Sequence, residues 1–323
     1  MKKEGICRNH VIATGLFAGV FIISSCVTHS ARGSWSEIPP LPTARSYLTA
    51  TYFDGKIYTI GGSVHYEARP VVDVYDTESG TWIESFPLPE HRAGHDAVVL
   101  NGEIWLIGGL GYSMIHNSVV SFDPVHKTWT DRVPLPYRLD YPAAEVVGGK
   151  IFVVGGKAAE KGGDPVPYTF EYNPETEVWT ERASMHNPRY KHATASLNGK
   201  IYVFGGVSVR GAPPISEVEM YDPETDTWSI ITDMPYEREL HEAISFGDAI
   251  FIIGGNNTMS LTNFSRVSIY YPASNKWIEG PELIGPCMNC GCDTDGKNIY
   301  IFGGSIDMDV RTTSDHCERY SLK

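Results

Sequence analysis

The chain has a deficit of positive charge. Its 323 residues include 26 lysines and arginines against 39 aspartates and glutamates, which gives a formal net charge of −13 at pH 7. Nucleic acids and anionic membrane surfaces attract proteins mainly through clusters of basic residues. A chain this acidic is a poor candidate for general binding to either, and we expect no nucleic-acid partner.

The sequence also lacks a hydrophobic run long enough to cross a bilayer comfortably. The apolar stretch of residues 11–24 covers 14 residues, whereas a transmembrane helix needs about 20. It follows Lys2 and Lys3, and a basic start before a short apolar stretch is typical of an export signal that lies outside the fold. The stretch runs into Ile23-Ser24-Ser25-Cys26, which resembles the lipobox of bacterial lipoproteins.

The lipobox resemblance implies that residues 1–25 are removed and that Cys26 becomes the lipidated first residue of an exported, membrane-anchored protein. Residues 26–33 would form a short tether. Residue 27 is valine rather than aspartate, which by resemblance to lipoproteins of Gram-negative bacteria points to the outer membrane. An ordinary signal peptide cleaved nearby and an uncleaved anchor are the alternatives.

Motifs of common catalytic sites are missing as well. The sequence contains no Gly-x-Ser-x-Gly, no His-Glu-x-x-His and no phosphate-binding loop. We therefore expect no cofactor, and the chemistry of an enzyme would have to come from residues that no local motif reveals.

Cysteine is scarce, and two of the six cysteines form a Cys-x-x-Cys, Cys287 and Cys290. A disulfide is one interpretation, because an exported protein meets oxidising conditions. Packing as small apolar side chains is a second, and a metal or redox site is a third. We expect no metal, because a zinc site normally needs four ligands and this motif supplies two.

What the sequence does contain is an internal repeat. A pair of glycines returns six times at steps of 47 to 50 residues, and a period in this range is typical of repeat architectures. The pairs are Gly61-Gly62, Gly108-Gly109, Gly155-Gly156, Gly205-Gly206, Gly254-Gly255 and Gly303-Gly304.

Each repeat predicts four strands. A short apolar run such as residues 57–60 ends in the glycine pair, and a hairpin signal such as Asp54-Gly55 precedes that run. An aromatic residue follows, and in five repeats a tryptophan comes seven positions later, as Trp82 follows Tyr75. A lone four-stranded sheet cannot bury both faces, whereas copies packed around an axis can, as in a β-propeller.

The two ends of the chain predict how the ring closes. The last repeat reaches Tyr320 and stops at Lys323 before any tryptophan, while Trp35 stands alone 47 residues before Trp82. The N-terminal strand around Trp35 should therefore complete the last sheet and protect its edge. The predicted fold is all-β, a six-bladed propeller over residues 34–323.

The glycine pair, the Tyr–Trp spacing and an arginine ahead of the first strand resemble the kelch repeat over about residues 34–323. The resemblance implies the propeller fold and leaves the activity open. In kelch proteins that bind acidic peptides, arginines at one mouth of the central channel make the contacts. The corresponding arginines, sixteen residues before a glycine pair, are Arg45, Arg92, Arg189 and Arg238.

These arginines are the first candidate ligand-binding residues, because a guanidinium group matches the geometry of a carboxylate. The alternative is that they cap loop carbonyls or pack on neighbouring blades. The segments after the glycine pairs differ most among the repeats, and variable loops on a rigid scaffold often carry recognition. They contribute the exposed candidates Tyr66, Tyr112 and Asn256.

Two further columns lie in the first strand of the repeats. Strand alternation places His95, His192 and His241 between sheets, where we expect structural histidines rather than ligands. Acids occupy the opposite face of the same strand and are expected to form a solvated lining of the channel: Asp96, Glu145, Glu242 and Asp293.

Two functions are compatible with these features. The first is a monomeric, envelope-tethered module that binds a protein segment or a glycan at the arginine-ringed mouth. The second follows from resemblance to exported kelch-like propellers that act as sialic acid epimerases. In such an isomerase an arginine would hold the sugar carboxylate, and a channel acid or histidine would transfer the proton. A perturbed acid in a deep pocket beside Arg92 or Arg189 would favour the enzyme.

Overall fold

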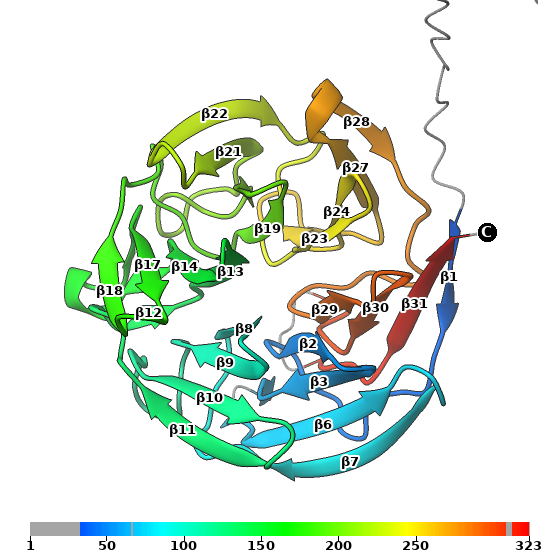
Figure 1. The fold of residues 1–323 in the computed structure, drawn as a ribbon. Helices are drawn as coiled ribbons and strands as arrows, with labels where there is room; N and C mark the ends of the chain where they lie inside the picture. Colours follow the sequence, from blue (N-terminus) through cyan, green and yellow to red (C-terminus); the bar gives the residue numbers. More distant parts are fainter. Residues whose placement is uncertain (1–32, 66, 308–311, 323) are drawn as a thin grey trace, which may run out of the picture. The chain divides into compact units, whose positions relative to one another are not determined.

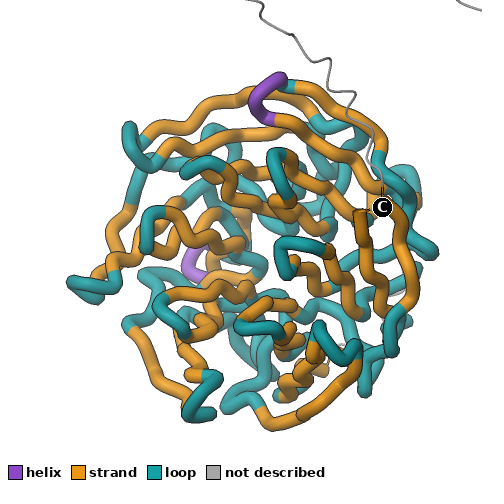
Figure 2. The backbone as a smooth tube through the Cα atoms, turned by 45° about the vertical axis from the view of Figure 1, so that its right-hand side comes forward, coloured by secondary structure: helices purple, strands orange, loops and turns teal. Residues whose placement is uncertain are grey.

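The computed structural model describes residues 33–65, 67–307 and 312–322. Within them the regular secondary structure is almost entirely β-strand, with two short helical turns, η1 (Ala159–Lys161) and η2 (Pro272–Ser274), which Figure 2 shows in purple. Contacts group the described residues into one compact unit. None of the described helices is long and apolar enough to cross a membrane.

Six antiparallel four-stranded sheets make up this unit. The first three, from inner to outer strand, are β2 (Thr49–Phe53), β3 (Lys56–Ile60), β6 (Val71–Asp76) and β7 (Thr81–Pro87); β8 (Asp96–Leu100), β9 (Glu103–Ile107), β10 (Val119–Asp123) and β11 (Thr128–Arg132); β13 (Ala143–Val147), β14 (Lys150–Val154), β17 (Thr169–Asn173) and β18 (Val178–Glu181).

The fourth and fifth sheets follow the same order along the chain, and the sixth takes its outer strand from the N-terminal end. Their strands are β19 (Ala193–Leu197), β20 (Lys200–Phe204), β21 (Glu217–Asp222) and β22 (Thr227–Asp233); β23 (Glu242–Phe246), β24 (Ala249–Ile253), β27 (Val267–Tyr271) and β28 (Lys276–Glu279); β29 (Gly291–Thr294), β30 (Asn298–Phe302), β31 (Cys317–Leu322) and β1 (Gly33–Glu37).

The sheets are arranged around a common centre (Figure 1). The inner strands β2, β8, β13, β19, β23 and β29 lie nearest the centre, each contacts the next, and β29 contacts β2. Strand β1 pairs antiparallel with β31, so that Trp35 lies opposite Tyr320. The two ends of the described chain therefore share one sheet.

The glycine pairs make the contact between one sheet and the next. The second glycine of each pair donates its backbone N–H to a carbonyl just before the inner strand of the following sheet, over 2.7–2.9 Å. Gly62 bonds in this way to Arg92, and Gly304 bonds to Arg45 in the first sheet. A Cβ on the first glycine would lie 2.1–2.8 Å from the same carbonyl oxygens. Both glycines of every pair also have positive φ, so a side chain is excluded twice over.

The aromatic columns hold the outer half of each sheet. The third-strand aromatic lies directly opposite the fourth-strand tryptophan, and the six ring pairs have centroids 4.7–5.4 Å apart. Four indole N–H groups also donate to carbonyls just after the outer strand of the preceding sheet, as Trp228 does to Ala183 over 2.8 Å. Each tryptophan of this kind joins two sheets.

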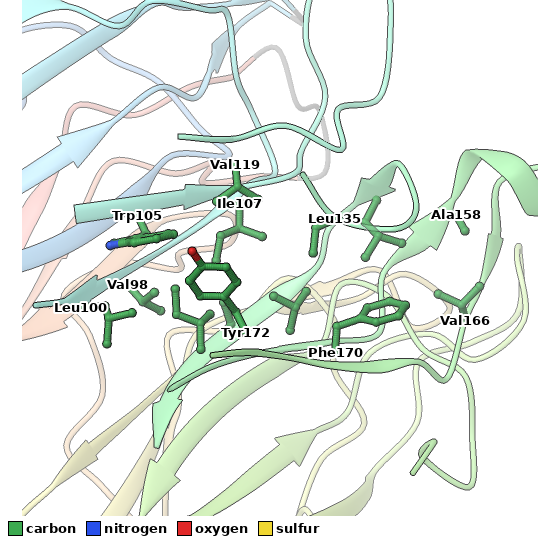
Figure 3. Close-up of a cluster of buried hydrophobic side chains, with 14 residues drawn as sticks. Val98, Leu100, Trp105, Ile107, Val119, Leu135, Ala158, Val166, Phe170 and Tyr172 are labelled. Atoms are coloured by element: carbon green, nitrogen blue, oxygen red, sulfur yellow. The ribbon is translucent and has the colours of Figure 1, made fainter. Parts of the chain in front are cut away.

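The hydrophobic core is divided into six clusters, and each lies between two neighbouring sheets. Figure 3 shows the cluster between the second and third sheets, where Trp105 and Ile107 of one sheet face Tyr172 of the other. Burial between sheets is the main stabilising term, because a single sheet would leave these side chains in water.

Small two- and three-stranded elements decorate the segments that follow the glycine pairs. Those within these segments are β4 (Ser63–Val64), β5 (Glu67–Ala68), β15 (Lys157–Ala158), β16 (Asp164–Pro165), β25 (Asn256–Asn257) and β26 (Thr262–Asn263), and β12 (Leu139–Asp140), which precedes the inner strand of the third sheet, pairs with β15. We call these segments, in their described parts, the post-glycine loops: residues 63–70, 110–118, 157–168, 207–216, 256–266 and 305–316. The face of the unit that carries them is the loop face.

Candidate functional site: the loop face and the central cavity

The four arginines of the predicted mouth lie inside the fold. Arg45, Arg92, Arg189 and Arg238 are each 0% exposed. Three of them donate to the carbonyl of the first glycine of a pair, Arg92 to Gly108 over 3.0 Å. The prediction that these side chains form a ligand-binding ring is therefore wrong. The reason is that a buried carbonyl requires a donor, and the guanidinium group supplies it.

Other partners hold the guanidinium groups in place. Arg45 bonds to Asp73 over 2.6 Å, and Arg189 bonds to Glu219 over 2.6 Å, with both side chains of that second pair at 0% exposure. Burial lowers the pKa of Arg238 to about 10, although the nearby Glu279 acts in the opposite direction. All four positions thus belong to the structural alternative, capping of loop carbonyls.

Cys287 occupies the arginine position of the sixth sheet and plays the same part. Its thiol donates to the carbonyl of Gly303 over 3.4 Å. Cys287 and Cys290 are both buried and both are free thiols in the structure. The geometry corresponds to packing, the second of the three interpretations of this motif, and not to the disulfide.

The other predicted site residues differ in exposure, and two of them are not described. Tyr112 projects from its post-glycine loop and is 81% exposed. Asn256 was expected to be exposed, but it is 2% exposed, and its backbone lies between Asn263 of the β25–β26 hairpin and Glu239, with which it exchanges two hydrogen bonds. Tyr66 and the lipidation candidate Cys26 lie outside the described residues.

A cavity of about 410 Å³ runs along the inner strands. The four predicted acids line it: Asp96, Glu145, Glu242 and Asp293. Among the described lysines and arginines, Lys191 alone lines the cavity, and its ammonium group is paired with Glu239 over 2.7 Å. The cavity therefore holds more carboxyl groups than compensating cations.

Burial raises the pKa values of all four acids. The pKa is about 7 for Asp96 and Glu145 and about 6 for Asp293, and that of Glu242 lies well above its usual range. Asp96 accepts the backbone N–H of Ala144 in the next sheet, and Asp293 accepts that of Tyr52. No group of the described residues hydrogen-bonds Glu242, so its carboxyl is the one available to an occupant.

The histidine column lies where strand alternation predicts, buried against the neighbouring sheets. Desolvation lowers the pKa of His95 and His192 to about 3, and it lowers the pKa of His241 well below its usual range. These rings are neutral at physiological pH. Among the described residues, no group of three or more histidines, cysteines or acids is placed to hold a metal ion.

At the end of the cavity next to the post-glycine loops lies a ring of six lining residues, one just before the inner strand of each sheet, which we call the mouth ring. All six have left-handed backbone conformations with φ of 54–59°: Tyr47, Gly94, Tyr141, Lys191, Leu240 and Asn289. Five backbone hydrogen bonds of 2.8–3.0 Å connect neighbours around the ring. Non-glycine residues in this conformation are strained and persist only where the surroundings hold them.

Tyrosines occupy one side of the mouth. The rings of Tyr47 and Tyr141 meet edge to face at 5.9 Å, and Tyr141 meets Tyr190 at 6.2 Å. The ammonium group of Lys157 lies 5.4 Å from the Tyr141 ring and 5.1 Å from the Tyr190 ring. Sequence reasoning missed this cluster. The available signal was the column fourteen residues before each glycine pair, which contains both Tyr47 and Tyr141.

Exposed apolar side chains are concentrated on the post-glycine loops. Seven of the fourteen exposed large hydrophobic residues of the described chain belong to post-glycine loops: Leu110, Tyr112, Met114, Val209, Met259, Leu261 and Ile306. Exposed large apolar side chains that share one face of a protein are candidates for an interaction surface.

None of the four cavity acids bonds to Arg92 or Arg189, whose acidic partners are Glu90, Glu217 and Glu219. The arrangement that would favour the sugar isomerase is therefore not the one observed. The buried arginines offer no free guanidinium face to a sugar carboxylate.

Comparison with protein families bears on the whole repeat. The family model described as the Attractin/LZTR1 beta-propeller matches residues 57–304. This range includes all six glycine pairs and more than half of the chain, and it confirms the expectation of a kelch-type β-propeller. No curated protein matches the chain.

Proposed function

Because the chain belongs to the Attractin/LZTR1 beta-propeller family, we propose that it is a protein-interaction module that binds a segment of a partner protein on its loop face. The observation that carries this proposal is the gathering of exposed apolar side chains on the post-glycine loops. Aromatic residues and methionine are enriched at protein interfaces, and Tyr112, Met114 and Met259 are such residues.

The proposed domain is a closed, six-bladed propeller over residues 34–323. Six four-stranded sheets, the pairing of β1 with β31 and the glycine hydrogen bond that returns from Gly304 to Arg45 support it. A closed ring holds the six loops at constant distances from one another, so they can act as one binding surface.

A protein segment fits this face better than a glycan does. Aliphatic and thioether side chains such as Met114, Met259 and Leu261 make up much of the exposed apolar surface. They pack well on apolar side chains, whereas sugars need hydrogen-bonding groups and flat aromatic surfaces. The glycan alternative would predict saturable binding of neutral oligosaccharides.

The test is selection of peptides from a random displayed library on the purified full-length protein, followed by affinity measurements with loop-face variants. Tyr112→Ser combined with Leu261→Ser should weaken the selected peptides at least about tenfold, because exposed aromatic anchors carry much of the binding energy at interfaces. The matched control, Ile83→Ser with Val125→Ser, removes exposed apolar side chains outside the post-glycine loops and should change nothing.

Failure to enrich any peptide would overturn the proposed function. Enrichment of peptides whose affinity is equal in both double variants would overturn the assignment to the loop face. Thermal denaturation of the variants checks that all of them are folded, since each replaced side chain is exposed.

We also propose that the module is exported and held at the outer membrane of the bacterial envelope by lipidation of Cys26. The lipobox-like sequence before Cys26 supports this. The protein should enter the detergent phase on phase partitioning and carry an acyl mass on Cys26, and a Cys26→Ser variant should enter the aqueous phase. A wild-type protein recovered in the aqueous phase without acyl groups would contradict the anchor.

A further inference from the structure

We propose that the central cavity receives a lysine or arginine side chain, carried by the partner segment that docks on the loop face. The inference rests on the proposed function and names the chemistry of the partner. The partner segment would be an apolar loop with one basic residue at its centre. Its apolar side chains would cover the post-glycine loops, and the basic side chain would pass through the mouth ring.

The carboxyl groups of the cavity argue for a cationic occupant, because a nearby cation favours their ionised form. Four acids line it, while the ammonium group of Lys191 at the mouth is already paired with Glu239. Asp96 and Asp293 hydrogen-bond to the backbone of the next sheet, so their positions are set by the fold. Glu242 has no such partner among the described residues. A guanidinium or ammonium group would supply the hydrogen bonds that Glu242 lacks.

The mouth of the cavity suits a cation as well. Tyr47, Tyr141 and Tyr190 form a continuous aromatic cluster beside the opening. Two lysine ammonium groups already lie over these rings, Lys157 at 5.1–5.4 Å and Lys191 at 5.5 Å from a ring centroid. Both lysines are paired with carboxylates, Lys157 with Asp140 over 3.0 Å. The surroundings of these rings therefore stabilise cations. Because both lysines are paired with carboxylates, they add little repulsion toward an incoming cation.

A second feature points to a polypeptide rather than a simple cation. Asn289 lies in the mouth ring and lines the cavity, it is 6% exposed, and its Nδ2 has no hydrogen-bond partner among the described residues. A buried amide donor without an acceptor is costly. A backbone carbonyl of an inserted peptide would provide that acceptor. The cavity volume of about 410 Å³ falls within the range of about 300–1,000 Å³ typical of ligand pockets.

The direct test uses small probes that copy the two basic side chains. Butylguanidinium and butylammonium chloride are titrated into the full-length protein at low ionic strength, with sodium butyrate and butanol as probes of opposite or no charge. Ligand-observed NMR should detect binding of the two cations and not of butyrate or butanol. Butyrate bound as well as butylguanidinium would overturn the proposal.

The variant that decides is Glu242→Gln, which keeps the shape of the side chain and removes its charge. It should weaken butylguanidinium about tenfold or more, because the amide oxygen still accepts a hydrogen bond but the pairing of opposite charges is lost. The matched control Glu224→Gln changes an exposed acid in a turn outside the cavity and should leave the affinity unchanged. Equal affinities of wild type and Glu242→Gln would overturn the proposal.

Peptides selected on the loop face separate this inference from the proposed function. We expect the selected peptides to share a lysine or arginine, and norleucine in its place should lose as much affinity as Glu242→Gln does. Peptides that bind the loop face without a basic residue and ignore Glu242→Gln would overturn the inference while the proposed function stands. Butylguanidinium binding with no peptide enriched would overturn both the partner segment and the proposed function, and the cavity would be a site for small organic cations only.

Discussion

Replacing Arg189 by methionine tests whether the arginine column is structural. Methionine keeps most of the volume of the aliphatic stem and removes every guanidinium hydrogen bond. Arg189 donates to the carbonyls of Gly205 and Glu217 and to the carboxylates of Glu217 and Glu219. Glu219 is 0% exposed, so the substitution breaks a buried ion pair and leaves its anion behind.

Breaking a buried ion pair by removing one partner costs about 3–5 kcal/mol. Glu219 retains the backbone N–H groups of His186 and Asn187 and the ring of His186 at 2.8–3.2 Å. The expected loss is therefore near the lower end, about 3 kcal/mol, which is a large part of the roughly 5–15 kcal/mol that stabilises a domain. For a chain of this size it corresponds to a fall in Tm of about 6 °C.

Scanning calorimetry measures the effect, with Arg138→Met as the control. Arg138 neighbours the arginine position of the third sheet, but its pair with Glu160 is exposed, at 43% and 37%. An exposed pair contributes about 0–1 kcal/mol, so this variant should keep its Tm within about 2 °C. If Arg189→Met melted as the wild type does and instead lost peptide binding, the arginine would belong to a binding site, and its structural role would be refuted.

Three further predictions concern the cavity, the glycines and the first strand. Burial raises the pKa values of the cavity acids, so the folded state holds protons that the unfolded state releases, and the contribution of these acids to stability falls as pH rises from about 4 to about 7. Glu242→Gln should therefore raise the urea midpoint at pH 7.5 and make stability depend less on pH. A variant less stable than the wild type at this pH would contradict the prediction. Gly254→Ala places a Cβ 2.1 Å from a carbonyl oxygen at φ +63° and should lower the free energy of unfolding, measured in urea, by at least about 3 kcal/mol. The control Gly285→Ala has open space around its new Cβ and should lose far less stability. Equal losses of stability in the two variants would refute the steric explanation. Trp35→Phe keeps a ring opposite Tyr320 but loses the indole bond to Pro281, and a loss of about 1 kcal/mol is expected; an unchanged melting curve would show that this bond contributes nothing.

Much of the fold could be predicted because the repeat reports the same local structure six times. The glycine pair, the aromatic residue and the tryptophan recur in one order, and each reflects a local requirement such as a positive φ or a ring opposite a ring. The burial of the histidines followed from strand alternation alone, since side chains two positions apart share a face.

The arginine column shows where this kind of reasoning fails. Regular spacing placed Arg92 near one end of the inner strand, which is where it lies, but spacing does not say where a long flexible side chain points. The side chain turns inward because the carbonyls of Gly108 and Ser118 need donors there. The error at Asn256 has a similar origin, because a residue that looks like a loop residue in the sequence is paired on both sides, with Glu239 and with Asn263.

The amino-acid sequence by itself determined the repeat, the strand order and the all-β class, because backbone conformation and hydrophobic alternation are local properties. Tertiary structure alone decided that four acids from four sheets face one cavity, that Tyr47, Tyr141 and Tyr190 meet at its mouth, and that Glu242 lacks the backbone partner that Asp96 has. These residues are separated by roughly one repeat or more along the chain. Their proximity arises only when the sheets pack around a common centre, and so do the charge and the raised pKa values that make the cavity a candidate site.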